Sequence, residues 1–344
     1  METASTLTGG AGWAIIHPLG ASQAGVFVTK TTEKPILCVG ITPCLQRTLQ
    51  FAQLELGDVN RARAVTVSAG GKACTMASVL QTLGEAPLVT GFLGGDTGQL
   101  VEAYLQARNI GCNFVATRQP TRVCSTILDE TTGQVTELVE EAALPSPDDW
   151  CQFDGKLVAL LVECGMVVIS GALPPKAPDY IYANIAQKAV TLGVPLLIDS
   201  QKTPLMNTLP YQPLMIKLNR RELADTCQVA IESDDDMIRA ARGLVARGAQ
   251  WALVTQGPRT GWLVSAQELW RCQPPTIQAV NPIGAGDSTT AGVAYALRQG
   301  QSMPDATRFG LACGTADALT VVPGQVNRAE VQRLLPWVKL EKVG

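Results

Sequence analysis

The sequence predicts an α/β protein built on a doubly wound, mostly parallel sheet, with a small β-sheet lid. From residue 36 onward, short apolar runs alternate with amphipathic segments of helix length. The apolar runs are nearly continuous, which is typical of parallel strands buried on both faces. Two stretches that contain segments of polar and apolar alternation interrupt this order. The chain has 344 residues, of which 46% are hydrophobic, enough for one large domain with an appendage.

The buried strands are predicted from the apolar runs, and the helices from the segments between them. The predicted strands are Ile36–Ile41, Leu88–Gly91, Val167–Ser170, Leu196–Asp199, Met215–Leu218 and Ala252–Thr255. The helix-length segments include Lys72–Leu83, Gly98–Arg108, Pro178–Leu192 and Asp235–Arg247. This alternation predicts a series of βαβ units and therefore a doubly wound sheet.

The lid is predicted from two stretches, residues 48–67 and 122–139, which contain segments of period two such as 65–67 and 134–138. Such a period is typical of strands exposed on one face. We expect these strands to fold over the carboxyl edge of the main sheet as part of one domain, residues 36–344. Residues 1–35 are rich in Gly, Ser, Thr and Ala and are expected to form a poorly ordered extension. Partial docking of this segment on the domain is the alternative.

Composition excludes several classes of function. A formal net charge of -3 gives no basic surface for nucleic acid, and no apolar run approaches the roughly 20 residues that span a bilayer. The ten cysteines form no CxxC pair, which favours reduced thiols in a cytoplasmic protein over a disulfide framework. The single histidine, His17, lies in the predicted extension. Proton transfer is therefore assigned to carboxylates or lysines.

The strongest local motif is Asn-Pro-Ile-Gly-Ala-Gly-Asp-Ser-Thr-Thr-Ala-Gly, residues 281–292. Gly284, Ala285 and Gly286 permit a tight turn whose amides point one way at a helix N-terminus, which is an anion site. Asp287 then lies in the first helical turn, either as a general base or as an ordinary capping aspartate. A carboxylate beside an anion hole fits phosphoryl transfer. A P-loop NTPase and a dinucleotide dehydrogenase lose support, because neither glycine-rich motif occurs after a strand.

Motifs along most of the chain resemble those of the ribokinase-like (phosphofructokinase B type) carbohydrate kinases. The residues 281–292 are similar to the C-terminal signature of that family, and the run Ser68–Ala77 resembles its Gly-Gly-Lys-Gly-x-Asn-x-Ala element. Further matches follow in family order at residues 91–96, 169–174, 217–223 and 254–257. The run Gly57–Asn60 resembles the branch of 1-phosphofructokinase and tagatose-6-phosphate kinase. The resemblance covers roughly residues 36–335 and implies ATP and Mg²⁺ as cofactors.

The resemblance also implies roles for individual residues. The residues expected to bind the sugar phosphate are Gln46, Gly70, Gly71, Lys72, Thr75 and Arg122, with Lys72 and Arg122 holding its phosphate. Those expected on the nucleotide side are Lys217, Asn219, Glu222, Thr255, Gly257 and Gly314. Glu222 would hold Mg²⁺ indirectly, through water. The plainer alternatives are solvated surface charges for the two cations and an ordinary first-turn helix acid for Glu222.

The chain departs from the family at the sugar-binding edge. Where the family reads Asn-Pro-x-x-Asp, residues 42–46 read Thr-Pro-Cys-Leu-Gln, and Ala73 and Thr75 replace a glycine and an asparagine of the glycine element. Gln46 can donate and accept hydrogen bonds, but it carries no charge. The phosphate-binding motifs are present and the sugar-recognition edge is altered, so the identity of the substrate is affected more than the chemistry.

The function predicted from these motifs is ATP-dependent phosphorylation of a ketohexose monophosphate, with fructose 1-phosphate as the leading substrate. Two alternatives stay open: a non-catalytic sensor of sugar phosphate or nucleotide, and a kinase of an unphosphorylated sugar or nucleoside. The lid is expected to close over the sugar and exclude water. A homodimer through the lids is also expected, because the lid leaves strand edges that a partner subunit can cover.

Overall fold

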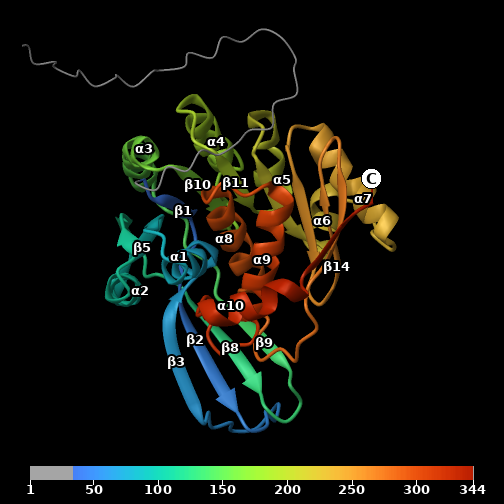
Figure 1. Cartoon of the computed structure of the whole chain (residues 1–344). Coiled ribbons are helices and arrows are strands. Elements are labelled where there is room, and N and C mark those ends of the chain that lie inside the picture. The colour runs from blue at the N-terminus through green and yellow to red at the C-terminus, as the bar shows by residue number, and fades with distance from the viewer. Residues whose placement is uncertain (1–33, 344) are drawn as a thin grey trace, which may run out of the picture.

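The computed structural model describes residues 34–343, and the predicted extension lies almost wholly outside the described residues. A ten-stranded sheet forms the centre (Figure 1). Across the sheet its strands are β16 (Lys339–Lys342), β15 (Leu269–Gln273), β14 (Arg259–Val264), β13 (Ala252–Gln256), β12 (Met215–Asn219), β11 (Leu196–Asp199), β10 (Met166–Ser170), β1 (Ile36–Gly40), β4 (Leu88–Thr90) and β6 (Gly111–Cys112).

Seven neighbouring strands of this sheet, from β6 to β13, pair in parallel, and β14, β15 and β16 add an antiparallel edge. From β1 the chain first builds outward through β4 and β6, and it later returns to β10 on the other side of β1 and builds outward through β11, β12 and β13. The direction of winding therefore changes between β1 and β10. The predicted doubly wound, mostly parallel fold is confirmed, and the carboxyl ends of β1 and β10 mark the place where such folds bind ligands.

Helices cover both faces because successive strand side chains point to opposite sides. Ile36 and Cys38 of β1 belong to the core on one face, and Leu37 and Val39 to the core on the other. The first face is covered by α1 (Lys72–Thr82), α2 (Gly95–Ala107), α8 (Ala285–Arg298), α9 (Met303–Asp317) and α10 (Arg328–Leu334). The second is covered by α3 (Pro147–Glu163), α4 (Ile181–Thr191), α5 (Lys202–Met206), α6 (Arg220–Cys227) and α7 (Asp234–Ala246).

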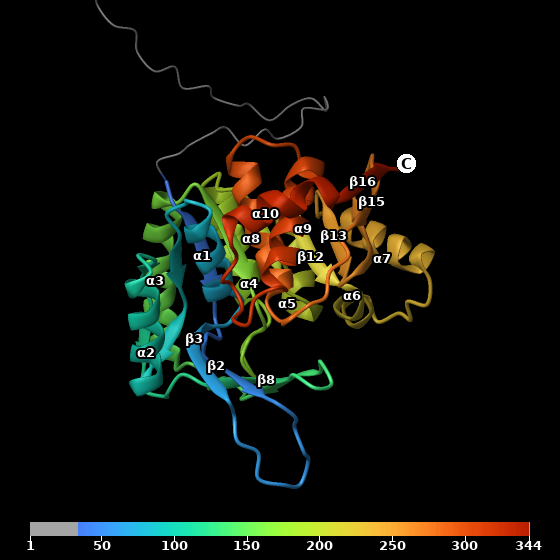
Figure 2. The ribbon, with the colours of Figure 1, turned by 60° about the horizontal axis from the view of Figure 1, so that its bottom comes forward.

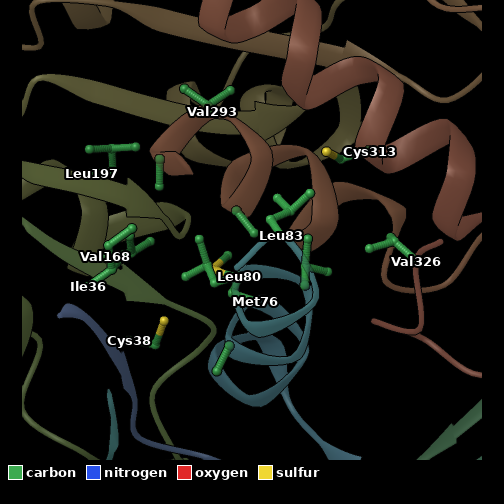
Figure 3. Close-up of a cluster of buried hydrophobic side chains, with 14 of the residues drawn as sticks. Ile36, Cys38, Met76, Leu80, Leu83, Val168, Leu197, Val293, Cys313 and Val326 are labelled. Atoms are coloured by element: carbon green, nitrogen blue, oxygen red, sulfur yellow. The ribbon is translucent and has the colours of Figure 1, made fainter. Parts of the chain in front are cut away.

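The core on the first face gathers around α1 (Figure 3). Met76 and Leu80 of this helix and Leu83 just beyond its end lie among side chains of the strands and of α8 and α9, and all three are at most 2% exposed. The buried sulfur of Cys313 belongs to this cluster, as expected for a cysteine that acts as a small hydrophobe. The packing of α1 against the sheet and α8 fixes where the N-termini of these two helices lie.

Helices α8 and α9 approach each other at three glycines. A β-carbon at Gly292 would lie 2.8 Å from the Cα of Gly310, and one at Gly310 would lie 2.5 Å from the backbone oxygen of Thr289. A β-carbon at Gly314 would lie 2.5 Å from the backbone oxygen of Ala285 and even closer to the Thr289 hydroxyl. These distances leave no room for a side chain, so the two helices are in backbone contact.

A separate four-stranded sheet, here called the lid sheet, projects from the main body (Figures 1 and 2). In order across the sheet its strands are β3 (Ala64–Gly70), β2 (Cys44–Phe51), β8 (Val123–Asp129) and β9 (Val135–Val139). β2 and β8 are parallel and the other pairs antiparallel. The small sheet expected beside the main one is therefore present, and β3 and β9 are its edges.

The remaining elements are a two-stranded sheet of β5 (Phe92–Gly94) and β7 (Val115–Thr117) and two 3₁₀ turns, η1 (Leu209–Tyr211) and η2 (Leu335–Trp337). All ten cysteines lie in the described part of the chain and are free thiols. No helix within residues 34–343 has the length and apolar character needed to cross a bilayer.

Candidate functional site

A cavity of about 470 Å³ lies where the winding of the main sheet changes direction. Its floor includes Gly40 and Thr42, at and just beyond the end of β1, and Ser170 and Gly171, at the end of β10 and just beyond it. The lid sheet, the end of β12 and the N-termini of α1 and α8 form the walls. The topology alone predicts a ligand site here.

Both helix N-termini at the cavity begin at a glycine with a positive φ angle. Gly71 before α1 and Gly284 before α8 each have φ +89°, and neither helix has a side-chain cap. A β-carbon at Gly284 would lie 2.7 Å from the Cβ of Pro323, so a side chain would not fit there. No side chain therefore caps the first amides of either helix, although the Ala285 N–H donates to the Pro282 carbonyl at 3.3 Å. Uncapped helix N-termini are able to bind an anion, and the anion site at residues 284–286 stays a prediction.

Asp287 is the third residue of α8, and its side chain lines the cavity. It does not cap its own helix, so the structure gives no support for the simple capping alternative. Burial raises the pKa of Asp287 to about 7; the Lys72 and Lys217 ammonium groups oppose this rise, and the Asp199 and Glu222 charges add to it. A carboxyl group with a pKa near neutrality is suited to accept a proton at physiological pH.

A buried carboxylate, Asp199 at the end of β11, organises the charges beside Asp287. It is fully buried and accepts hydrogen bonds from Lys72 Nζ at 2.6 Å and from Thr290 Oγ1 at 2.9 Å, with Lys217 Nζ 3.1 Å away. Burial by itself would raise the pKa of Asp199, but the two lysines outweigh burial and lower it to about 2. Asp199 therefore stays ionised and holds both ammonium groups at the cavity.

The two lysines lie on the Asp287 side of the cavity. Burial would lower the pKa of Lys72, but the charges of Asp199, Asp287 and Glu222 raise it above its usual value. Lys217 is 3% exposed, and its ammonium group lies against Gly286, where a β-carbon would be 2.5 Å from Nζ. A positive charge thus sits directly beside the amides at the start of α8.

Asn219 and Glu222 form a capping box at the start of α6. Glu222 N–H donates to Asn219 Oδ1 at 2.9 Å, and Asn219 N–H donates to Glu222 Oε2 at 2.8 Å. Glu222 is therefore a first-turn helix acid, as its plainer alternative states. Its other oxygen, Oε1, lies 3.5 Å from Lys72 Nζ, and both residues of the box line the cavity. The Glu222 carboxylate thus caps α6 with one oxygen and interacts with Lys72 at the cavity with the other.

The lid side of the cavity holds Gln46 and Arg122, two of the predicted sugar-binding residues. The buried Gln46 amide donates to Thr126 Oγ1 at 2.8 Å, so part of its hydrogen-bonding capacity is used within the lid sheet. Arg122 donates from Nη1 to the Glu140 carbonyl and from Nη2 to the Thr42 carbonyl, each at 2.9 Å. Arg122 Nε is buried and has no hydrogen-bond partner within the described residues. The guanidinium group therefore ties the end of β1 to the lid and keeps donor capacity.

Most of the predicted site residues line this one cavity, and a few do not. Those that line it are Gln46, Gly70, Gly71, Lys72, Thr75, Arg122, Lys217, Asn219, Glu222, Gly284, Gly286 and Asp287. Thr255 pairs with Asn219 near the carboxyl ends of β13 and β12. Gly257 lies in the turn between β13 and β14, and Gly314 lies where α9 contacts α8. Ala285 lies between the two cavity-lining glycines of α8.

Sequence reasoning did not assign a role to several residues of the cavity region. Asp199 ends a predicted buried strand, and a charged residue at the end of an apolar run was the available signal. Cys44, Cys124 and Glu137 line the lid side, where a hydrogen bond with Cys44 lowers the pKa of Cys124 to about 7. Pro323 lines the cavity from a loop after α9, and no local sequence motif predicted that this loop would reach the cavity.

The chain is similar to known proteins in sequence and in fold. The chain matches the pfkB family carbohydrate kinase over residues 34–321. A putative phosphofructokinase from Staphylococcus aureus is 28% identical, with a TM-score of 0.74 over 90% of this chain and 99% of that chain. Phosphofructokinase-2 from Escherichia coli in complex with potassium has a TM-score of 0.82 at 24% identity, over 88% of this chain and 99% of that chain.

A possible 1-phosphofructokinase from Thermotoga maritima shares the fold as well, with a TM-score of 0.84 at 22% identity over 90% of this chain and 99% of that chain. The family match spans both halves of the cavity, from the glycine element before α1 to the turn before α8. The chain belongs to the pfkB family of carbohydrate kinases.

Proposed function

We propose that this protein transfers the γ-phosphoryl group of ATP to a hydroxyl group of a ketohexose monophosphate, with fructose 1-phosphate as the leading substrate and a bisphosphate as the product. The observation that carries the proposal is the position of Asp287. Its carboxyl group faces the cavity from the first turn of an uncapped helix, with a pKa raised by burial to about 7 and the Lys72 and Lys217 charges close by.

The proposed chemistry divides between a base and an anion hole. Asp287 accepts the proton of the attacking hydroxyl as the oxygen approaches phosphorus. The amides of Gly284–Asp287, here called the anion-hole loop, stabilise the charge on the transferring group. Lys217, whose ammonium group lies against Gly286, adds a positive charge at the same place. Closure of the lid sheet over the sugar keeps water from accepting the phosphoryl group.

Magnesium fits this site only as an ion held mainly by water and by the phosphates of ATP. Within residues 34–343, no group of three or more His, Cys, Asp or Glu side chains is placed to hold a metal ion. Mg²⁺ keeps several waters and takes few protein carboxylates, so one indirect contact from Glu222 suffices. When bound, the ion neutralises phosphate charge. Glu222 would hold one of its waters, with the carboxylate oriented by the Asn219 amide.

The phosphate already on the sugar is assigned to the lid side of the cavity. Arg122 lies there with buried, unpartnered Nε, and it is a residue suited to a phosphate dianion. Lys72 is paired with Asp199 and Glu222 near Asp287, so it serves the transferring phosphoryl group as well as the sugar. The similarity to a putative phosphofructokinase and to a possible 1-phosphofructokinase supports a phosphorylated sugar as substrate.

The test is ADP release from Mg-ATP in the presence of fructose 1-phosphate, fructose 6-phosphate, tagatose 6-phosphate or an unphosphorylated sugar. Turnover of one sugar phosphate supports the proposal, and Arg122→Gln should then raise the KM for that sugar. An unchanged KM in this variant would favour an unphosphorylated substrate. The second candidate is a sensor, favoured by the use of the Gln46 amide inside the lid sheet. ATP binding with no turnover of any sugar would support it.

The lid sheet is also proposed to form a homodimer. Its edge strands carry four apolar side chains that are each between 46% and 54% exposed, Val65, Val67, Leu138 and Val139. Apolar side chains gathered on exposed strand edges favour contact with a partner subunit. We expect Val65→Asp to lower the mass measured by light scattering from dimer to monomer, because a carboxylate in the interface would lose its water. Val190→Asp, on the exposed face of α4, is the matched control. A monomeric mass for the unaltered protein would refute the dimer.

A further inference from the structure

A second buried carboxyl group, which the proposed chemistry does not use, lies behind the anion-hole loop. Asp317 is the last residue of α9 and is 1% exposed. Its Oδ1 accepts a hydrogen bond from the Gly324 N–H at 2.7 Å, across the turn that follows α9. Gly324 has φ +78°, and a β-carbon there would lie 3.0 Å from the Thr75 carbonyl oxygen of α1. The Asp317 side chain therefore fixes a turn that is packed between two helices.

This turn is in contact with the anion-hole loop. Pro323, next to Gly324, lines the cavity, and a β-carbon at Gly284 would lie 2.7 Å from Pro323 Cβ. The same β-carbon would lie 2.9 Å from Asp317 Oδ2. Gly284 thus touches both the turn and the carboxyl group that holds it. The Asp317 carboxyl group is therefore in contact with the backbone of the anion-hole loop at Gly284.

The surroundings of Asp317 offer little compensation for a negative charge. Asp317 Oδ2 and the Ser288 hydroxyl are both buried, and within residues 34–343 neither has a hydrogen-bond partner of ordinary geometry. The Ser288 hydroxyl is nevertheless near enough to Asp317 to affect its pKa. Burial raises the pKa of Asp317 to about 7; Ser288 and the Gly324 amide oppose the rise and the Asp287 charge adds to it.

The titratable neighbours of Asp317 are a carboxyl group and a thiol. Asp287 faces it from α8, and Cys313 lies one turn earlier on its own helix. At their contacts with the turn, α1 contributes Thr75 and Ser78, which carry no charge, and the turn itself contributes Pro323 and Gly324. Within the described part of the chain, the groups that shift the pKa of Asp317 are Ser288, Gly324 and Asp287, and none of them is a cation. An ionised Asp317 would therefore be a buried negative charge beside the anion-hole loop, held by the Gly324 amide but without a neighbouring cation.

We propose that Asp317 is a positioning residue that holds the Pro323–Gly324 turn against the anion-hole loop, and that it must be uncharged for this loop to bind the ATP phosphates at full strength. The inference rests on the proposed function, because it takes the loop to be the phosphate site. The physical reason is that a negative charge behind the amides lowers the positive potential they present to the cavity, in a region of low dielectric constant. By linkage, bound ATP should in turn favour the protonated form of Asp317.

The test measures ATP binding separately from turnover. Calorimetry in an Asp287→Asn background removes the titration of Asp287 and prevents transfer, and the double variant Asp287→Asn/Asp317→Asn is compared with it between pH 6 and 8.5. The ratio of the two affinities cancels the titration of ATP itself. We expect a ratio near one at pH 6 that rises about 5-fold or more by pH 8.5 in favour of the double variant. A ratio that does not change with pH would overturn the charge requirement.

Two further variants separate the holding role from simple stability. Asp317→Ala removes the acceptor for the Gly324 N–H, whereas Asp317→Asn keeps it. The alanine variant should therefore bind ATP more weakly than the asparagine variant at every pH. Equal binding by both at pH 6 would refute the holding role. Asp235→Asn, an exposed aspartate of α7, should leave the pH dependence unaltered. If no sugar is phosphorylated but the variants bind ATP as expected here, the proposed function is contradicted and the role of Asp317 is not.

Discussion

Replacing Asp287 by asparagine should lower kcat by at least roughly 10²–10⁴-fold, the range typical of general base catalysis. The amide has nearly the shape of the carboxylate but cannot accept the proton of the attacking hydroxyl. The anion-hole amides and Lys217 remain, so ATP should still bind. The measurement is ADP release with the sugar phosphate that the native protein turns over, alongside calorimetric binding of ATP.

The same variant should be more stable than the native protein above neutral pH. The pKa of Asp287 is raised by burial to about 7, against about 3.9 for an unfolded chain. The folded protein therefore holds this proton more tightly, and its stability falls as the pH rises from the lower value to the higher one. Asparagine removes this loss, so urea unfolding should show a gain on the order of 2 kcal/mol at pH 8 that is smaller at pH 5. Native-like kcat in this variant would refute the assignment of Asp287 as the base.

Replacing Asp199 by alanine should destabilise the protein by about 3–5 kcal/mol, the cost typical of removing one partner of a buried ion pair. Lys217 is 3% exposed and would lose the carboxylate 3.1 Å from its ammonium group. Lys72 would lose its hydrogen bond of 2.6 Å, so activity should fall as well. Urea unfolding at pH 7 measures the loss. Asp199→Asn keeps an acceptor for Thr290 and should lose less.

The pH dependence of this loss has a definite sign. The lysines lower the pKa of Asp199 to about 2, so its ionised form stabilises the folded state above the unfolded value of about 3.9. The difference between native protein and variant should therefore shrink as the pH falls from about 5 toward 2. Glu130→Ala is the control, because its ion pair with Arg63 is exposed and should contribute less than about 1 kcal/mol. Equal losses for the buried and exposed pairs would contradict the role assigned to Asp199.

The fold was predictable because its signals are local. Runs such as Leu196–Asp199 are apolar on both faces up to the final aspartate, and the structure places a strand at those same residues. The start of α8 was predictable for the same reason, since Gly284 and Gly286 specify a turn within a few residues. The antiparallel edge of β14, β15 and β16 was not predicted. Its last strand pairs residues 339–342 with 270–273, and such a distant pairing leaves no periodic signal in either segment.

The charges of the site were predicted less completely than its glycines. Lys72 and Lys217 could be singled out by motif, but their common partner Asp199 lies on another strand, and only folding brings the three together. The carboxyl group of Asp317 was missed for a similar reason. It ends a helix with no unusual sequence, and its contact with Gly284 arises from the close approach of α9 to α8.

The backbone contact between α8 and α9 has a mechanical consequence. Side chains that touch can change rotamer and let two helices slide, whereas main chains in contact at Gly292, Gly310 and Gly314 have no such freedom. The start of α8 is thus held in a fixed position by its backbone contact with α9. We expect any closing motion at the site to come from the lid sheet, which is separate from the main sheet. If the lid sheet closes as proposed, the extent of its movement would determine how tightly a substrate is held.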